Sequence, residues 1–237
     1  DLETLKLLVN RGANVNIEHR KWLTPLCLAL IYKDNEMVKL LIASGADVNK
    51  ASYDGDNTET PLRKAMGDYR RTPNPEAVKL LIQAGAKTEW KDEYGITELM
   101  YACRKSSPEI VQYLLDHGAS IFYRTKGNTT AMLSVLSDAS EENKIIIRSK
   151  VDSLFVGKTL QAVDNINLRT EQNTGSKKLT TLAKGSQVRI LQTGDFDEYD
   201  NIQSCWVKVS TVKGAKDKNG NHVAAGTEGW LFAGYLK

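Results

Sequence analysis

The sequence predicts a multi-domain α + β chain: an all-α solenoid of stacked helix pairs over residues 1–156, followed by a small all-β barrel over residues 157–237. In the first part, a pattern of two short amphipathic helices recurs with a period of 33 residues, which is typical of solenoids. After Phe155 the pattern changes to short alternating stretches separated by glycines, which favours a small closed or nearly closed sheet.

Composition and charge argue against two classes of partner. Apolar residues make up 41% of the chain and charged residues 26%, as in an ordinary globular protein. No run approaches the roughly eighteen uninterrupted apolar residues of a membrane span, so we expect none. The net charge of +3 is spread over interspersed acidic and basic residues, without a polybasic tract. We therefore expect neither nucleic acid nor an anionic membrane surface as a partner.

The stretch from Thr97 to Gly118 shows the repeat most clearly. Thr97 lies 21 residues before Gly118 and 12 residues after Gly85, which gives the 33-residue period. Thr97 is predicted to cap a first helix, and Gly118 to end a second helix in the left-handed conformation. Ser106 stands three residues before Glu109, which predicts a reciprocal capping box at the start of the second helix.

Residues 1 to 155 resemble the ankyrin-repeat family, because the motifs TPLCLAL, GADVN, TPLRKAM and GANVN recur in register. The resemblance implies two antiparallel helices per repeat, a projecting finger, and a concave face that grips protein partners. It also implies a truncated first repeat followed by four repeats, the last one a cap whose second helix spans residues 141–155. The family's His after Thr-Pro-Leu is replaced here, by Cys27, Arg63, Met100 and Leu133. We therefore expect the hydrogen bonds that this His makes between repeats to be missing.

The segment from about Lys158 onward resembles a bacterial Src-homology-3-type (SH3b) domain. Three pieces carry the resemblance. Ile166-Asn167-Leu168-Arg169 is similar to the family's opening strand, and the stretch from residue 182 to 188 is similar to its turn into the next strand. Gly229-Trp230-Leu231, followed by Tyr235-Leu236, is similar to the closing strand and its short helical turn.

The SH3-like segment is not predicted to bind proline-rich peptides. Such peptides need an aromatic floor, and the resemblance places Cys205 and Phe232 where that groove carries a Trp and a Pro. We expect Trp206 and Trp230 to pack inside the barrel. The hairpin from residue 194 to 204 allows two interpretations: a solvated loop, which we favour, or an acidic and aromatic recognition loop for a basic ligand.

No catalytic or metal-binding constellation is predicted. His19, His117 and His222 do not stand in a zinc-ligand or catalytic spacing with another His, Cys or acidic residue. Cys27 and Cys103 are expected to be small buried apolar residues on the first helices of their repeats. We therefore expect no catalytic residue, no metal and no cofactor, and a chain that is not an enzyme.

The predicted partner-binding residues occupy the exposed side of the first helices and an inserted finger. Tyr and Arg are favoured at such positions because they often anchor interfaces. The predicted set is Tyr32, Tyr53, Lys64, Asp68, Tyr101, Arg104 and Lys105. Tyr101, Arg104 and Lys105 form the narrower prediction, because neighbouring repeats do not share them.

The predicted function is a non-enzymatic protein–protein interaction module, in which the ankyrin surface binds a protein partner and the SH3-like barrel is appended. Two alternatives stay open: a cell-envelope protein whose barrel binds peptidoglycan or cell-wall peptides, and an accessory part of a larger enzyme. The chain opens at Asp1 within an amphipathic helix and without an initiator Met, so we expect a piece of a longer protein. The SH3b resemblance favours the bacterial periplasm or cell envelope over the cytoplasm.

Overall fold

The computed structural model describes residues 1–18, 23–53, 58–67, 71–123 and 139–237. Two compact units make up the chain, residues 1–146 and residues 147–237. The predicted fold class is confirmed, since the described elements of the first unit are mainly helices and the second unit contains a six-stranded antiparallel sheet. The domain boundary that we expected between residues 156 and 157 stays a prediction.

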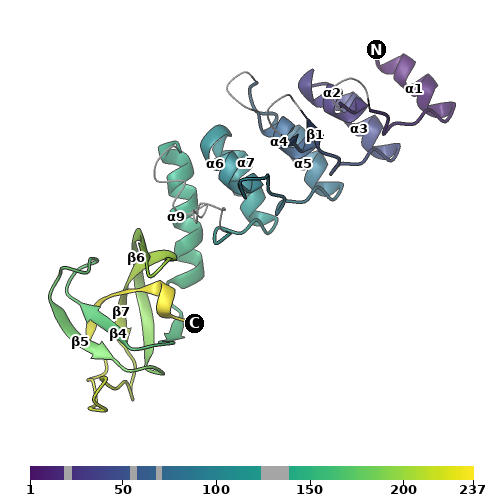
Figure 1. The fold of residues 1–237 in the computed structure, drawn as a ribbon. Helices are drawn as coiled ribbons and strands as arrows, with labels where there is room; N and C mark the ends of the chain where they lie inside the picture. Colours follow the sequence, from purple (N-terminus) through teal and green to yellow (C-terminus); the bar gives the residue numbers. More distant parts are fainter. Residues whose placement is uncertain (19–22, 54–57, 68–70, 124–138) are drawn as a thin grey trace. The chain divides into compact units, whose positions relative to one another are not determined.

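Stacked helix pairs form the first unit (Figure 1). Its described helices are α1 (Leu2–Asn10), α2 (Pro25–Ile31), α3 (Asn35–Ala43), α4 (Pro61–Met66), α5 (Pro75–Gln83), α6 (Glu98–Lys105) and α7 (Pro108–Asp116), and α9 (Glu141–Phe155) begins in this unit and continues into the second. Helices α2 and α3, α4 and α5, and α6 and α7 are the pairs of three successive repeats. A short hairpin of β1 (Ser52–Tyr53) and β2 (Thr58–Glu59) precedes α4. The described helices therefore follow the predicted repeat.

Threonine caps begin the first helix of each described pair. The side chains of Thr24, Thr60 and Thr97 accept hydrogen bonds from backbone N–H groups three residues later, at 3.2, 3.0 and 3.2 Å. Each cap satisfies an N–H group that the first helical turn leaves without an intrahelical partner. Gly118, just after α7, has a φ of +90°, which confirms the predicted left-handed stop.

The predicted capping box at the start of α7 is wrong. Ser107 is the N-cap and makes no side-chain capping bond. The hydroxyl of Ser106 instead donates to the backbone oxygen of Met66 in the preceding repeat, at 2.5 Å. The Ser106 hydroxyl thus makes a hydrogen bond between two repeats and does not cap α7.

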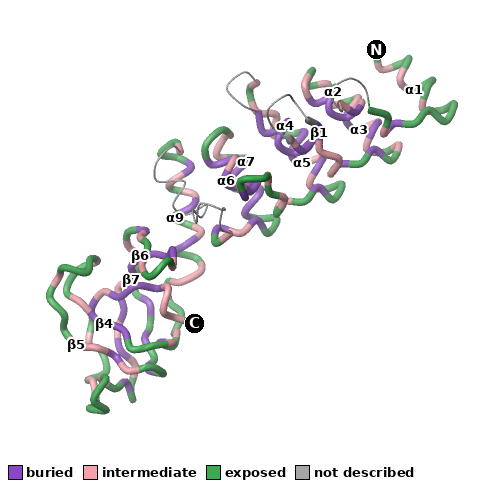
Figure 2. The backbone as a smooth tube through the Cα atoms, in the orientation of Figure 1, coloured by how far each residue is buried: buried purple, intermediate pink, exposed green. Residues whose placement is uncertain are grey.

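Leucines at equivalent positions build the apolar core of the repeats. Leu26, Leu62 and Leu99 are each at most 1% exposed, and buried stretches recur along the helix pairs (Figure 2). Asparagines link the turns that follow the second helices. Asn49 donates from Nδ2 to the backbone oxygen of Gly85, at 3.1 Å, and its Oδ1 accepts from the following turn. Polar bonds between repeats are therefore present although the family's His is replaced.

Six antiparallel strands form the sheet of the second unit. They are β3 (Thr159–Gln161), β4 (Ile166–Arg169), β5 (Lys178–Leu182), β6 (Gln187–Tyr199), β7 (Ile202–Thr211) and β8 (Glu228–Phe232), followed by the 3-10 helix η2 (Ala233–Tyr235). The strand order is β3-β6-β7-β8-β4-β5. Strand β4 has the bounds of the predicted opening strand, and Tyr235 lies in the predicted short helical turn.

Residues 194–204 form a strand hairpin that extends the sheet, with shifts of register before Phe196, so the loop that we favoured is wrong, although several of its residues are exposed. Phe196 and Cys205 pair across the hairpin, and both side chains are buried. Its turn is Asp200-Asn201, whose φ values of +48° and +59° fit a two-residue turn of this kind. Trp206 is buried, as predicted, whereas Trp230 is only half-buried.

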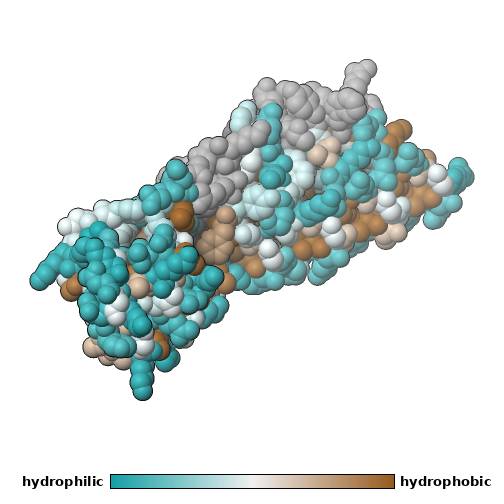
Figure 3. All heavy atoms as spheres, turned by 60° about the horizontal axis from the view of Figure 1, so that its bottom comes forward, coloured by the Kyte–Doolittle hydropathy of each residue, from teal (hydrophilic) through white to brown (hydrophobic). Residues whose placement is uncertain are grey.

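Apolar side chains recur among polar ones along the face of the repeats that Figure 3 shows. The most exposed of the large apolar residues include Leu7 on α1, which is 59% exposed, and Tyr32 after α2, which is 80% exposed. Within the described residues, no helix is both long and apolar enough to cross a membrane.

Candidate functional site

A pocket of about 290 Å³ opens on the repeats between the first helices and the fingers. We call it the repeat pocket, and it is lined by Glu59, Arg63, Asp92, Tyr94, Ile96, Tyr101, Arg104 and Lys105. Tyr101, Arg104 and Lys105 are the three residues of the narrower sequence prediction, and the fold brings them together here. Arg104 and Lys105 are exposed, and Tyr101 is half-buried.

Arg63 forms the floor of the repeat pocket and joins two repeats. Its Nε donates to Glu98 Oε2 at 3.1 Å, its Nη1 to Asp92 Oδ2 at 2.9 Å, and its Nη2 to the backbone oxygen of Ile96 at 3.0 Å. Arg63 stands where the family has His, so the expected loss of hydrogen bonds between repeats is wrong at this position. A guanidinium presents several donors in a fixed plane, which suits three acceptors from one neighbouring repeat.

Two aromatic rings contact the Arg63 guanidinium. Its central carbon lies 5.0 Å from the Trp90 ring centre and 4.9 Å from the Tyr101 ring centre, in the range of cation–π contacts. The Tyr101 hydroxyl donates to the backbone oxygen of Gly67 at 2.9 Å. The floor of the pocket is therefore fixed before any partner arrives.

Glu98 is the buried counter-charge of Arg63. It is fully buried, and the Thr60 hydroxyl donates to its Oε1 at 2.5 Å. Desolvation raises the pKa of the Glu98 carboxyl, because burial disfavours its charged form, while the Arg63 charge opposes this shift. Burial of this ion pair costs desolvation free energy, which the hydrogen bonds of both partners offset.

Lys64 does not lie on the exposed side of its helix, contrary to our expectation. Its side chain is 0% exposed, and its Nζ donates to Glu59 Oε2 at 2.9 Å. Arg71 also pairs with this carboxylate oxygen, at 3.2 Å. The local pattern could not reveal that an acidic residue from the preceding finger would draw the ammonium inward.

The other predicted residues lie away from the repeat pocket or outside the described part. Tyr32 is exposed and lines a separate apolar groove between α1 and α2, beside Leu8 and Leu28. Tyr53 belongs to β1, but its side chain lies outside the described residues, as does the whole of Asp68.

Sequence reasoning missed the two residues that organise the repeat pocket, Arg63 and Glu98. A signal was present: Arg63 replaces the family's His, and Glu98 replaces the Pro of the Thr-Pro-Leu motif in the next repeat. A basic residue in place of the His in one repeat, and an acidic residue in place of the Pro in the next repeat, could have predicted the ion pair.

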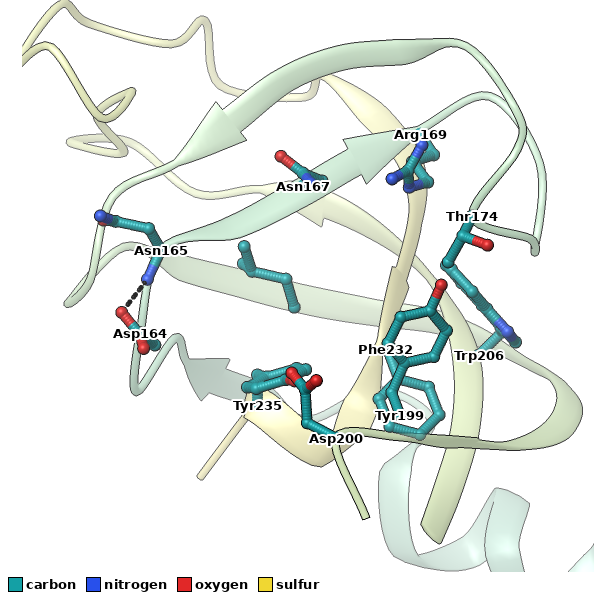
Figure 4. Close-up of a pocket in the computed structure, with 11 residues that line it drawn as sticks. Asp164, Asn165, Asn167, Arg169, Thr174, Tyr199, Asp200, Trp206, Phe232 and Tyr235 are labelled. Carbon is teal, nitrogen blue, oxygen red and sulfur yellow. Dashed lines mark hydrogen bonds between the residues drawn. The ribbon is translucent and has the colours of Figure 1, made fainter. Parts of the chain in front are cut away.

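The second unit carries another pocket, of about 270 Å³, between the β6–β7 turn, strand β4 and η2 (Figure 4). We call it the barrel pocket. Its aromatic wall is a cluster in which Phe232 is central, with ring centres at 5.6 Å from Tyr199, 6.0 Å from Trp206 and 6.2 Å from Tyr235. An aromatic floor is therefore present, although we expected none. It is built by Tyr199, Trp206, Phe232 and Tyr235. Cys205, which the resemblance placed where the groove carries a Trp, does not line the pocket.

Carboxylates stand at the edge of the barrel pocket. The Tyr235 hydroxyl donates to Asp200, and Asp164 also lines the cavity. The hydrogen bond to Asp200, burial and the negative charge of Asp164 together raise the pKa of Tyr235 to about 12. The local potential at this side of the pocket is therefore negative.

A titration checks this arrangement. The difference between the tyrosinate absorbance titrations of the parent chain and the Tyr235→Phe variant should show one group with a pKa of about 12. Because the folded pKa is raised above the ordinary value of 10.0, the hydrogen bond contributes fully below about pH 10 and is lost as pH rises through 12. In an Asp200→Asn background, the pKa of Tyr235 obtained from the same comparison should move back toward 10. A Tyr235 that titrates with the ordinary pKa in the parent would contradict the contact.

The cysteines have the environment of core residues. Cys27, Cys103 and Cys205 are free and buried, as predicted for the first two. Burial raises the pKa of the Cys103 and Cys205 thiols to about 12, so neither is a ready thiolate at neutral pH. The described ranges contain no group of three or more His, Cys, Asp or Glu that could hold a metal ion.

Family models match both parts of the chain. Residues 8–65 match a model of ankyrin repeats (many copies), and residues 70–152 match a model of ankyrin repeats (3 copies). Residues 164–237 match a model of the bacterial SH3 domain. Helices α2 and α3 lie within the first range, α6 and α7 within the second, and strands β4 to β8 within the third, whereas β3 precedes it.

Individual relatives are similar over about half of this chain. Ankyrin repeat and SOCS box protein 6 of Homo sapiens is 30% identical over 137 residues, which cover 55% of this chain and 31% of that protein. Transient receptor potential cation channel subfamily A member 1 of Homo sapiens is 30% identical over 118 residues, 49% of this chain and 10% of that protein. L-asparaginase of Dirofilaria immitis is 30% identical over 110 residues, 46% of this chain and 17% of that protein.

The chain spans less than a third of the length of each of these relatives. The family matches and the observed helix pairs and sheet agree in both parts. The chain therefore consists of ankyrin repeats followed by a bacterial SH3 domain.

Proposed function

We propose that this chain is a non-enzymatic module that binds a protein partner through the ankyrin surface centred on the repeat pocket. The observation that carries the proposal is the pocket itself, where exposed Arg104 and Lys105 stand beside Tyr94 and Tyr101 over a fixed floor. Tyr and Arg are the residues that most often supply interface binding energy, and a preorganised floor lowers the cost of binding.

Both kinds of domain in this chain are interaction modules and not catalytic ones. The proposal extends this to the chain as a whole and takes it not to be an enzyme. The burial of Cys103 and Cys205 supports it, because a nucleophile needs access to its substrate.

The test compares two triple variants of the full chain. Tyr94→Ala, Arg104→Ala and Lys105→Ala together remove exposed side chains at the rim of the repeat pocket and leave its buried floor intact. Affinity capture followed by mass spectrometry should identify a partner whose recovery falls about tenfold or more with this variant, since interface anchors are each worth about 1–4 kcal/mol. The melting temperature should stay at the parent value.

A matched control removes the same kinds of side chain elsewhere on the repeats. Arg11→Ala, Lys87→Ala and Phe122→Ala truncate two exposed cations and one exposed aromatic residue outside the repeat pocket. Recovery of the partner should be unchanged with this control. Equal recovery with both triple variants would count against the repeat pocket as the docking surface.

The bacterial SH3 domain supports a second candidate function, in which the chain belongs to the cell envelope and its barrel binds peptidoglycan or cell-wall peptides. The specific observation in its favour is the aromatic barrel pocket, which could receive a short peptide. Sedimentation of the full chain with purified cell-wall sacculi decides this candidate. A chain that remains in the supernatant counts against binding of peptidoglycan by the barrel.

A role as an accessory part of a larger enzyme has weaker support. One relative has the name of an enzyme, L-asparaginase, but the similarity covers only 17% of that protein. We therefore place this role below the two binding functions.

A further inference from the structure

A group of exposed lysines lies on the barrel, and none of them lines the barrel pocket. They come from two segments: residues 177–187, which include the edge strand β5, and residues 212–222, which follow the end of β7. We call this group the lysine patch, and its members are Lys177, Lys178, Lys184, Lys213, Lys216 and Lys218. The sequence has no polybasic tract, so it is the fold that brings the lysines of the two segments together.

Backbone hydrogen bonds hold the two segments of the lysine patch side by side. The N–H of Lys218 donates to the backbone oxygen of Thr181 at 2.9 Å. The N–H of Ala183 donates to the backbone oxygen of Lys216 at 2.8 Å. The ammonium groups of both segments are therefore near enough to one another to act on a single partner.

The positive charge of the lysine patch is not compensated within it. The two segments contain one acidic residue, Asp217. Its carboxylate is engaged in its own turn, where it accepts from the backbone N–H groups of Asn219 and Asn221, both at 2.9 Å, and from Asn221 Nδ2 at 3.0 Å. None of the patch lysines forms an ion pair with another residue that the structure describes. The patch therefore carries a positive potential.

An apolar side chain is exposed within the lysine patch. Leu179 is 44% exposed although it belongs to β5. Lys178 and Thr180 pair with successive residues of β4, so Leu179 between them is the extra residue of a bulge. A bulge re-aims side chains of the strand that contains it, which accounts for an exposed leucine beside Lys178.

The composition of the patch favours a lipid surface over other anionic partners. The two segments contain no Phe, Trp or Tyr on which bases could stack, and no Arg for bidentate contacts to phosphate or guanine. A lysine ammonium is a point charge, which suits a surface of diffuse negative charge. The exposed leucine distinguishes a bilayer from a soluble polyanion, because only a bilayer offers an apolar layer just below its charges.

We propose that the lysine patch binds the surface of a lipid bilayer that contains anionic lipids. The ammonium groups lie at the level of the lipid phosphates, and the side chain of Leu179 enters the boundary of the acyl chains. This attachment is peripheral. It goes beyond the proposed function of the ankyrin surface and involves none of the residues of the repeat pocket.

The direct test measures co-sedimentation of the full chain with vesicles. Vesicles of equal parts phosphatidylcholine and phosphatidylglycerol should capture the chain, whereas vesicles of phosphatidylcholine alone should not. Capture should weaken as salt is raised, because ions screen the lysine charges. Duplex DNA or polyglutamate, added at the same concentration of negative charge as the anionic lipid, should not release the chain.

Two variants test the two components of the patch. Lys178→Gln, Lys216→Gln and Lys218→Gln together should weaken vesicle binding about a hundredfold, since each lysine near an anionic surface contributes about fivefold. Leu179→Ala should weaken it about tenfold, because fewer CH₂ groups enter the acyl boundary, and should leave its salt dependence unchanged. Both variants should keep the melting temperature of the parent chain.

A matched control removes the same charge outside the lysine patch. Lys6→Gln, Lys87→Gln and Lys158→Gln alter three exposed lysines of other segments. This triple variant should bind the anionic vesicles as the parent chain does.

Four outcomes would overturn the proposal. The first is equal recovery of the parent chain with neutral and anionic vesicles. The second is equal binding by the patch and control triple variants. The third is release of the chain by DNA or polyglutamate, and the fourth is unchanged binding of Leu179→Ala; either would indicate a general polyanion site in place of a bilayer surface. None of these outcomes concerns the ankyrin surface, so the two proposals fail or stand separately.

Discussion

Replacement of Glu98 by Ala should lower the free energy of unfolding of the repeats by about 3–5 kcal/mol, the cost of leaving a buried charge without its partner. The Arg63 side chain is 5% exposed, and of its two carboxylate partners among the described residues Glu98 is 0% exposed and Asp92 is 15% exposed. Loss of Glu98 would also leave the Thr60 hydroxyl without its acceptor. Urea denaturation followed by helical circular dichroism measures the effect.

Two control variants separate charge from shape and from exposure. Glu98→Gln keeps the volume and the acceptor oxygen, so it should cost less than the alanine variant. Glu109→Ala removes an exposed carboxylate that pairs with Lys79 at 2.7 Å, and it should cost less than about 1 kcal/mol, as exposed pairs usually do. An alanine variant of Glu98 that is as stable as the Glu109 variant would show that the buried pair contributes nothing.

Gly67→Ala should destabilise the repeats by about 2–4 kcal/mol, from backbone strain and overpacking together. Gly67 ends α4 with φ +79° and ψ 177°, a conformation that is essentially restricted to glycine. A Cβ atom there would lie 2.5 Å from the backbone oxygen of Arg71 and 2.8 Å from the backbone nitrogen of Pro73. Backbone atoms cannot move aside as a flexible side chain can.

Gly85→Ala is the matched control for this prediction. Gly85 has a comparable φ of +91°, but a Cβ atom there would meet nothing within 4 Å. It should therefore cost only the strain of the left-handed conformation, about 1–2 kcal/mol. Thermal melting of both variants checks the difference, and equal melting temperatures would contradict the close approach at Gly67.

The parts of the fold that local chemistry decides could be predicted from the sequence. The Thr97 cap, the left-handed Gly118 and strand β4 each depend on a few neighbouring residues, and the structure confirms them. Tyr101, Arg104 and Lys105, which the sequence singled out because they lie on one side of one helix, line the repeat pocket, and their role in binding a partner stays a prediction. The failed capping box at Ser106 shows the limit, since a carbonyl 40 residues away takes its hydroxyl.

What could not be predicted depends on pairs that are distant in sequence and close in space. Arg63 and Glu98 are 35 residues apart, and only the stacking of two repeats buries them together. In the barrel, the aromatic wall joins Tyr199 to Tyr235 through Phe232. Our alignment placed the groove's Trp at Cys205, but Trp206 lines the cavity; a shift of one position along a strand exchanges the two faces of the sheet.

The contacts of Arg63 with the following repeat also determine how far local unfolding of the solenoid can advance. In a linear array each repeat is stabilised chiefly by its neighbours, so opening starts at an end and advances one interface at a time. The interface between α4 and α6 carries a buried ion pair, two cation–π contacts and the Tyr101–Gly67 bond. Fraying that begins at α1 would therefore be expected to stall at this interface, so that the repeat pocket stays assembled while the outer repeats exchange their amide hydrogens.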